Sequence, residues 1–260
     1  MKIHFNHSVS ILIPLHNKAL TITPTLNKLK EDLTHIDFEI IVIENSSTDN
    51  SFEVCQKWCQ ENKDVDIKLI TSKKGLGVAL KAGIDLAKND YLWTVPGDMQ
   101  LGTSDLESFI KYFDSNIKFY IGSRLHPKSD VERQSNRILI SSIFNLLKKI
   151  IINSNIKDSM GSFIAERKLI KKLYNLPKTK KFFYITELIS YYEFFGFKVL
   201  EIPVSTFKEI DLSSGNKSSV NFILDPIEIF FNLLMLRFRL IVSKVKKRKL
   251  SQMLKIYWTQ

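Results

Sequence analysis

The sequence contains little of what marks small secreted or fibrous proteins. Among its 260 residues there are two cysteines, nine glycines and seven prolines. A disulfide framework, a collagen-like repeat and a low-complexity chain are therefore excluded. Because 44% of the residues are hydrophobic and 25% are charged, the composition is that of a globular protein that is long enough to bury a core.

The two cysteines, Cys55 and Cys59, lie four residues apart in the segment VCQKWCQEN, a spacing that places both on one face of a helix. A zinc site needs further ligands, and no histidine or second cysteine pair stands near them in the sequence. We therefore expect two reduced thiols in or near the core.

The first residues lack the features of a signal peptide, because polar residues interrupt the short apolar run of MKIHFNHSVSILIPLHNK. A cytoplasmic protein is therefore expected.

The C-terminal tail lacks acidic residues: no Asp or Glu follows Glu228, whereas eight Lys and Arg residues do. Those eight account for most of the net charge of +11, so the sequence predicts a local basic surface and no binding of nucleic acid.

Apolar runs rich in β-branched residues alternate with segments of helical periodicity in the first half of the chain. The predicted strands are residues 9–15, 38–44, 66–71 and 91–95, and the predicted helices are 19–33, 51–62 and 76–88. This alternation predicts an α/β fold with a mainly parallel sheet flanked by helices. Further on, the sequence predicts helices over 104–115 and 131–152 and strands over 118–123 and 199–205.

Four polar loops follow the first four predicted strands: PLHNK, ENSSTDN, SKKGLG and PGDMQ. Ligands of such sheets bind beyond the carboxyl ends of the strands, so these loops are the candidate site. Glu44 and Asn45 could meet the edge of a base or a ribose, and KKGLG, at the start of a helix, suits a phosphate. Three of the loops also have a plainer interpretation: Ser47 or Thr48 as a helix cap, KKGLG as a simple connection, and Asp98 as a turn residue. Leu80 occupies the third glycine position of a dinucleotide fingerprint, which argues against a Rossmann oxidoreductase.

In order and spacing, VSILIPLHNK, IIVIENSSTDNS, KGLGVALKAGIDLAKNDYLWTVPGDMQ and IGSR resemble the family 2 glycosyltransferases, which have the A-type nucleotide-sugar-binding fold. The later segments RILISSIFN, DSMGSF, TELISYYEFFGFKVLEIPVSTF and SSGNKSS resemble the dolichol-phosphate mannose synthase branch. The resemblance covers residues 8 to about 220. It implies a catalytic domain over 1–220, with a nucleotide-sugar-binding half (1–103) and an acceptor-binding half (104–220), followed by a tail over 221–260.

The resemblance also implies functional residues in all four loops. The donor-binding candidates are Pro14, His16, Asn17, Lys18, Glu44, Asn45, Ser47, Lys74, Gly75, Gly97 and Asp98. Asp98 falls on the last Asp of the family's Asp-x-Asp metal motif and Gln100 on a further metal ligand, so Mg²⁺ or Mn²⁺ would neutralise the donor diphosphate. Arg124 and Arg137 match residues that hold the phosphate of the acceptor, and Lys217 is a third candidate there.

Three departures from the family pattern lie in these loops. Lys18 replaces the usual Glu, Asn45 replaces the usual second Asp, and Pro96 replaces the first Asp of the metal motif. With one carboxylate lost, we expect weaker metal binding. A catalytically silent nucleotide-sugar-binding protein is therefore an alternative to an enzyme.

The resemblance implies an inverting, single displacement, in which the protein stabilises negative charge that grows on the leaving phosphate, a task assigned to Asp98 with its metal. If the acceptor is a polyprenyl phosphate, its oxygen is already an anion, and Arg124 and Arg137 need only position it. If the acceptor is a hydroxyl of a surface glycan or glycolipid, a carboxylate has to take its proton, and Asp158 and Glu187 are the candidates. Both arginines have a solvated surface position as the alternative.

The tail is dense in Phe, Leu and Ile from 227 to 242, but Arg237 and Arg239 interrupt it before it reaches the roughly 20 residues of a membrane span. Followed by SKVKKRK, it predicts an amphipathic helix that lies on the anionic inner face of the cell membrane. A helix packed on the domain with a solvated basic end, or one that binds a partner protein, is the alternative.

Overall fold

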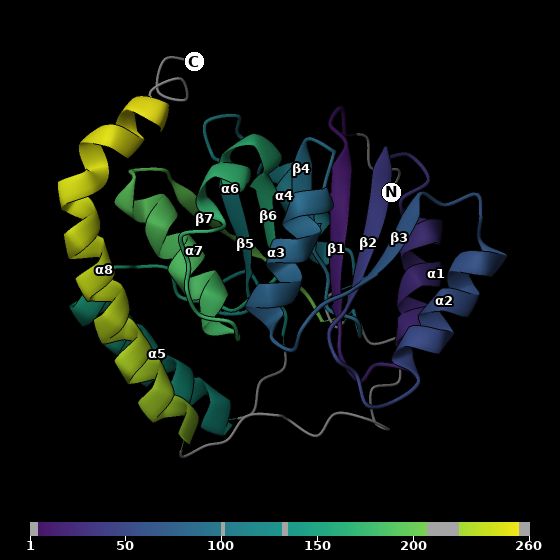
Figure 1. Cartoon of the computed structure of the whole chain (residues 1–260), viewed down its shortest axis with the longest axis horizontal. Helices are drawn as coiled ribbons and strands as arrows, with labels where there is room; N and C mark the ends of the chain where they lie inside the picture. The colour runs from purple at the N-terminus through teal and green to yellow at the C-terminus, as the bar shows by residue number, and fades with distance from the viewer. Residues whose placement is uncertain (1–4, 100–101, 132–134, 207–223, 255–260) are drawn as a thin grey trace.

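A mixed seven-stranded sheet forms the centre of the computed structural model, and helices cover both of its faces (Figure 1). The structure describes residues 5–99, 102–131, 135–206 and 224–254, without the side chains of 135–140, 224–226 and 244–254. The strand order is β3-β2-β1-β4-β6-β5-β7. The strands are β1 (Val9–Leu15), β2 (Phe38–Glu44), β3 (Ile67–Thr71), β4 (Tyr91–Thr94), β5 (Phe119–Ser123), β6 (Phe163–Glu166) and β7 (Val199–Pro203).

Helices connect these strands, and the last helix, α8, packs beside the long helix α5. The helices are α1 (Ile22–Asp32), α2 (Ser51–Glu61), α3 (Leu76–Leu86), α4 (Ser104–Lys111), α5 (Ser135–Ile152), α6 (Arg167–Leu173), α7 (Phe183–Phe194) and α8 (Leu224–Leu254). Helices α1, α2 and α4 pack in one apolar cluster, and α3, α6, α7 and α8 pack in the other. The predicted α/β fold is confirmed.

The central strands are apolar on both faces because both faces are covered. Ile11 and Ile13 of β1 belong to the cluster with α1 and α2, whereas Leu12 between them belongs to the cluster with α3. Strands β1 to β4 run parallel to one another, as predicted. Strand β6 is antiparallel to both β4 and β5, so the sheet is mixed and not wholly parallel.

Three elements lie outside the sequence-based predictions for physical reasons. Strand β6 has four residues and helix α6 has seven, too few for a periodic pattern to be distinguished. Helix α7 is buried from Phe183 to Tyr192, so it has no polar face and no amphipathic stripe. On α2, Cys55 is a buried free thiol and Cys59 a half-buried one, which confirms the prediction for the two cysteines.

Helix α8 lies along the outer side of α5 and α7, at the edge of the molecule (Figure 1). Leu233, Leu236 and Leu240 recur at helical spacing and are buried against the domain. No helix in the described part of the chain is long and apolar enough to cross a membrane. The tail therefore packs on the domain by one face, which is one of the three expectations for it, and the proposal of membrane contact rests on its other faces.

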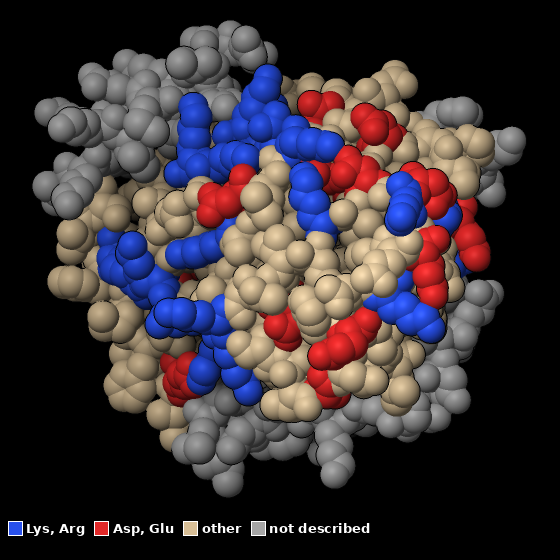
Figure 2. Space-filling view, turned by 45° about the vertical axis from the view of Figure 1, so that its right-hand side comes forward, with Lys and Arg blue, Asp and Glu red and all other residues tan. Residues whose placement is uncertain are grey.

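Charge is unevenly distributed on the face that carries α1 and α2. In Figure 2 the Lys and Arg side chains gather toward the left of the view, whereas Asp and Glu are intermixed with them toward the right. A surface of this kind attracts anionic ligands to one side more than to the other.

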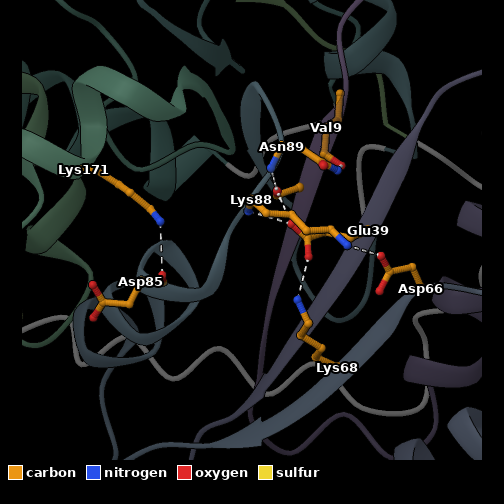
Figure 3. Close-up of polar contacts among 9 residues, drawn as sticks. Val9, Glu39, Asp66, Lys68, Asp85, Lys88, Asn89 and Lys171 are labelled. Atoms are coloured by element: carbon orange, nitrogen blue, oxygen red, sulfur yellow. Dashed lines mark hydrogen bonds and ion pairs between the residues drawn. The ribbon is translucent and has the colours of Figure 1, made fainter.

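A buried carboxylate joins three strands and a helix at the amino-terminal edge of the sheet. Glu39 of β2 is fully buried and accepts hydrogen bonds from Ser10 Oγ (2.6 Å), the backbone N–H of Lys88 (2.8 Å) and Lys68 Nζ (3.0 Å; Figure 3). Burial by itself would raise the pKa of Glu39, but these three donors outweigh it and hold the pKa below its ordinary value. The cluster stabilises the edge opposite the candidate site, so it bears on folding and not on ligand binding.

The substitution Glu39→Gln is expected to lower the free energy of unfolding by about 1–3 kcal/mol at pH 7, because an amide leaves a buried donor without its acceptor. Since the folded-state pKa is depressed, the carboxylate stabilises the protein above its unfolded pKa of about 4.3 and loses this effect as the pH falls through the folded pKa. Urea unfolding at pH 7 and pH 3.5 checks this. The gap between wild type and variant should narrow at the lower pH, and an equal gap at both would contradict the argument.

Candidate functional site

The loops that follow β1 and β2 are joined by side-chain hydrogen bonds. Asn17 accepts the backbone N–H of Thr48 on its Oδ1 (2.7 Å) and donates its own N–H to Ser47 Oγ (3.1 Å). Asn17 has a positive φ of 53°, a conformation that asparagine tolerates better than most residues. Helix α2 has Asn50 at its N-cap, so neither Ser47 nor Thr48 caps it, and these residues serve the contact between loops instead.

Asn45 joins the loop after β2 to the loop after β3. Its Nδ2 donates to Ser72 Oγ (2.8 Å) and to the carbonyl of Lys73 (2.7 Å), and its Oδ1 accepts the N–H of Gly75 (2.8 Å). Beside it, Glu44 accepts the N–H of Ser47. The amide of Asn45 is thus engaged with the chain itself, and its hydrogen bonds hold the loops after β2 and β3 together.

The loop after β4 is held against the loop after β1 and the start of α1. The carbonyl of Gly97 accepts hydrogen bonds from Thr21 Oγ1 (3.0 Å) and Thr25 Oγ1 (3.2 Å). Lys18 Nζ forms an ion pair with Asp98 Oδ2 at 2.7 Å. All four predicted loops therefore meet at one rim, at the carboxyl ends of β1 to β4.

The loop after β3 differs from the phosphate-binding helix start that the sequence predicts. The N–H of Gly77 donates to the carbonyl of Lys180 (2.8 Å), and that of Gly75 is used by Asn45. Gly75 has a φ of +130°, and a Cβ there would lie 2.5 Å from the carbonyl oxygen of Lys180. The segment around Lys180 passes so close to these two positions that only glycine fits there. The N–H groups of both glycines already donate hydrogen bonds within the protein. Lys74 beside them is exposed.

His16 and Pro14, at the end of β1, complete the donor candidates. Both are half-buried, and His16 Nδ1 is buried without a hydrogen-bond partner among the described residues. A buried ring nitrogen of this kind is costly unless a ligand or a water molecule satisfies it. The unsatisfied ring nitrogen is therefore a geometric reason, besides the resemblance, to keep His16 as a candidate contact of the nucleotide sugar.

The side chains around Asp98 do not form a set of ligands that fits a divalent cation. Pro96 supplies no ligand, and Gln100 lies outside the described residues. Within the described ranges, no group of three or more His, Cys, Asp and Glu side chains is placed to hold a metal ion. The ammonium of Lys18 already occupies Asp98, and a divalent ion about 4 Å from it would be repelled by roughly 8 kcal/mol at an effective dielectric constant of about 20.

A bidentate ion pair lies at the end of β5. Arg124 Nε and Nη2 donate to the two oxygens of Asp158 at 2.7 and 2.9 Å, and the Arg124 backbone N–H adds a bond of 3.0 Å. Asp158 is buried, whereas the side chain of Arg124 is 37% exposed, so Arg124 is the outer member of the pair. Burial would raise the pKa of Asp158, but the guanidinium outweighs it and holds this pKa below its ordinary value.

The arginine pair and the donor loops lie on the same edge of the sheet. Trp93 of β4 and Tyr120 of β5 both pair with Ile164 of β6. Asp98 follows Trp93 by five residues and Arg124 follows Tyr120 by four, and both strands run in the same direction. With one strand between them, the strands are roughly 10 Å apart, a separation that suits two substrates meeting across the edge.

Glu187, the second candidate for a general base, is enclosed by the protein. It is fully buried on α7; its Oε2 accepts the N–H groups of Lys178 (2.9 Å) and Thr179 (2.8 Å), and its Oε1 forms an ion pair with Arg239 of α8 (2.6 Å). A carboxylate held in this way connects the C-terminal helix to the domain and has no path to a substrate hydroxyl.

Sequence reasoning did not name Lys148, which is buried on α5 and donates to Ser159 Oγ at 3.2 Å. Burial lowers its pKa to about 8, partly offset by Glu201 and Asp158, so it stays cationic at neutral pH. In the sequence, Lys148 follows Phe144 by one helical turn and so falls on the apolar stripe of α5. This position predicts that Lys148 is buried. Arg137 lies in the first turns of α5, but its side chain and the whole of Lys217 are outside the described residues.

The parallel strands β1 to β4, with their polar loops gathered at one edge, define an α/β fold whose ligands bind beyond the carboxyl ends of the strands. The chain belongs to glycosyl transferase family 2, because residues 10–174 match the family model. It is therefore a glycosyltransferase by family, and its fold is the A-type fold that the resemblance predicts.

Two relatives and one solved structure show the range of similar proteins. Over 202 residues the chain is 26% identical to the glycosyltransferase AglD of Haloferax volcanii, covering 75% of this chain and 32% of that protein. Over 165 residues it is 27% identical to a dolichol-phosphate mannosyltransferase of Pyrococcus furiosus, covering 62% of this chain and 46% of that protein. The chain thus spans less than half the length of these two relatives.

The fold matches that of glucosyl-3-phosphoglycerate synthase from Mycobacterium tuberculosis, crystallised with Mn²⁺, UDP-glucose and phosphoglyceric acid. The TM-score is 0.66 and the sequence identity 12%, over 89% of this chain and 80% of that one. At this identity the likeness concerns the fold.

Restoring the family's usual acid with Asn45→Asp is expected to lower the free energy of unfolding by about 1–3 kcal/mol, because a carboxylate would face the carbonyl of Lys73. The matched control is Asn50→Asp, at an exposed N-cap that makes no side-chain cap bond, where an acid is favourable. Thermal unfolding of both variants checks this. Equal stability of the two would show that the Asn45 amide does not hold the loops together.

Proposed function

We propose that this protein transfers a sugar, with inversion, from a nucleoside diphosphate sugar to a polyprenyl phosphate at the cytoplasmic face of the membrane. The observation that carries the choice of acceptor is the Arg124–Asp158 ion pair beside the donor rim. It offers a partly exposed arginine side chain to a phosphate and turns one of the two candidate bases into the group that orients this arginine. The name of the Pyrococcus relative, a dolichol-phosphate mannosyltransferase, supports the same acceptor class.

The proposed reaction needs no proton transfer at the acceptor. A phosphate oxygen, already an anion, attacks the anomeric carbon from the face opposite the donor diphosphate; the new C–O bond forms as the old one breaks, and the nucleoside diphosphate leaves with the electron pair. The rim loops with His16, Glu44 and Asp98 hold the donor, and Arg124 holds the incoming phosphate. Arg137 and Lys217 stay candidates for the same phosphate on sequence grounds.

A sugar hydroxyl is the alternative acceptor and would need a base. Asp158 is a poor base because its pKa is held low, and Glu187 is enclosed by Lys178, Thr179 and Arg239. Neither carboxylate therefore supports the hydroxyl alternative as well as Arg124 supports a phosphate.

Transfer assays distinguish these possibilities. The purified protein is incubated with radiolabelled UDP- and GDP-sugars and either a polyprenyl phosphate or the corresponding polyprenol. We expect label in lipid only with the phosphate. Transfer to the polyprenol or to a glycan hydroxyl would favour the alternative, and donor binding without transfer or hydrolysis would indicate a catalytically silent binder.

Two matched variants separate a phosphate clamp from a general base. Arg124→Lys keeps the charge but loses the fork, so kcat/KM for the lipid phosphate should fall at least tenfold. Asp158→Asn releases the guanidinium and should cause a loss of similar size. Because the pKa of Asp158 is held below its ordinary value, the pH profile of the wild type should show no limb of a general base that titrates near neutral pH. A much larger effect of Asp158→Asn than of Arg124→Lys, with such a limb, would identify a base.

Membrane attachment is supported by the exposed faces of α5 and α8, which lie side by side. Large apolar side chains are exposed on both helices: Ile143, Leu146, Ile150, Ile227, Phe230, Phe231, Leu234, Met235, Phe238, Ile241 and Val242. Exposed apolar area of this extent is typical of a binding surface. Five basic residues between 244 and 249 follow in α8, which suits an anionic lipid surface.

The double variant Phe231→Asp and Phe238→Asp is expected to reduce binding to phosphatidylglycerol vesicles at least tenfold, because each buried ring contributes about 2 kcal/mol. The double variant Leu20→Asp and Leu86→Asp, at two exposed leucines outside α5 and α8, is the control with the same added charge and should bind as the wild type does. Co-sedimentation measures the binding. Unchanged binding of the double variant would assign this surface to another contact.

A further inference from the structure

We propose that the ammonium of Lys18 takes the place of a divalent cation at the donor diphosphate, so that this transferase works without a metal ion. The inference rests on the proposed use of a nucleoside diphosphate sugar. It also predicts a property, indifference to chelation, that can be measured apart from the identity of the acceptor.

The position of Lys18 is fixed from several sides. Its backbone N–H donates to Ser51 Oγ (2.8 Å), and its carbonyl accepts the N–H groups of Thr21 and Ile22 (3.0 Å each) at the start of α1. Its aliphatic stem lies over Gly97, where an added Cβ would be 3.3 Å from Lys18 Cγ. The ammonium is therefore held on the carboxylate of Asp98, at 2.7 Å, by packing as well as by charge.

The substitutions at the rim balance each other electrostatically. A divalent ion held by two carboxylates is neutral overall, and so is one ammonium held by one carboxylate. Pro96 removes a carboxylate and Lys18 adds a fixed cation in the same place, so the net charge of the site is kept at zero while the metal ligands are lost. Asp98 then acts as a positioning residue for Lys18 and not as a metal ligand.

Lys18 is also placed to meet a ligand. Its side chain is 26% exposed while that of Asp98 is 6% exposed, so the cation lies on the outer side of the pair, toward the rim formed by the four loops. An ammonium there donates N–H to a non-bridging oxygen of the diphosphate and attracts the charge that grows on the leaving group. No proton moves in this step, since Lys18 stays an ammonium while the nucleoside diphosphate departs.

Calorimetry with UDP and GDP tests the inference without reference to turnover. For the wild type, the Kd of the preferred nucleotide should differ less than about threefold between excess EDTA and excess Mn²⁺. Transfer activity should likewise survive EDTA. The double variant Lys18→Met with Asp98→Asn removes both charges at nearly constant size, avoids a lone buried carboxylate, and should bind the nucleotide at least tenfold more weakly in either condition.

A second variant restores the carboxylate pair and removes the competing cation. In the Lys18→Gln, Pro96→Asp protein, nucleotide binding should become dependent on Mn²⁺, with at least a tenfold loss in EDTA. Lys18→Arg is the conservative control, and it should keep metal-independent binding because it keeps the charge beside Asp98.

The possible outcomes separate the two proposals. If the wild type binds or transfers only with Mn²⁺ and EDTA abolishes this, the role of Lys18 is refuted while the proposed function stands. If neither UDP nor GDP, nor any of their sugars, binds with or without the metal, the proposed function fails and the inference fails with it. Metal-independent binding that is unchanged in the double variant would refute Lys18 as the cation.

Discussion

Hydrogen bonds between loops that leave neighbouring parallel strands hold this site together. β1 lies between β2 and β4, so its loop can reach the loops on both sides, and Asn17 and Lys18 make those two contacts. Asn45 extends the connection to the loop after β3. Without these bonds the strand ends would still be adjacent, but the side chains that face a ligand would not be fixed relative to one another.

The second half of the chain adds a different kind of constraint. Strand β6 runs against its neighbours and separates β4 from β5, which places Arg124 one strand beyond the donor rim. The guanidinium is held by a buried carboxylate, so its orientation costs little entropy when a phosphate arrives. Two substrates that are both anions can then be bound at separate cationic positions, Lys18 and Arg124, on one edge of the sheet.

Helix α8 connects the surface that we propose to contact lipid to this framework. Its inner face is buried by three leucines, and Arg239 reaches the fully buried Glu187. Glu187 in turn accepts hydrogen bonds from Thr179, in the segment whose Lys180 carbonyl accepts the N–H of Gly77 at the start of α3. The helix proposed to contact lipid and the loop after β3 are therefore parts of one continuous set of contacts.

The sequence by itself determined the succession of the first four strands and three helices along the chain. It also determined which loops form the rim and which family the chain resembles, because buried parallel strands and their polar ends have a local pattern. Only the tertiary structure decided what those side chains bind. Asn45, Asp158 and Glu187 have the residue types of ligand contacts or bases, yet each is engaged by groups distant in sequence, including Gly75, Arg124 and Arg239. The pairing of Lys18 with Asp98, 80 residues apart, is equally invisible to local pattern, since a charge is matched through space and not along the chain.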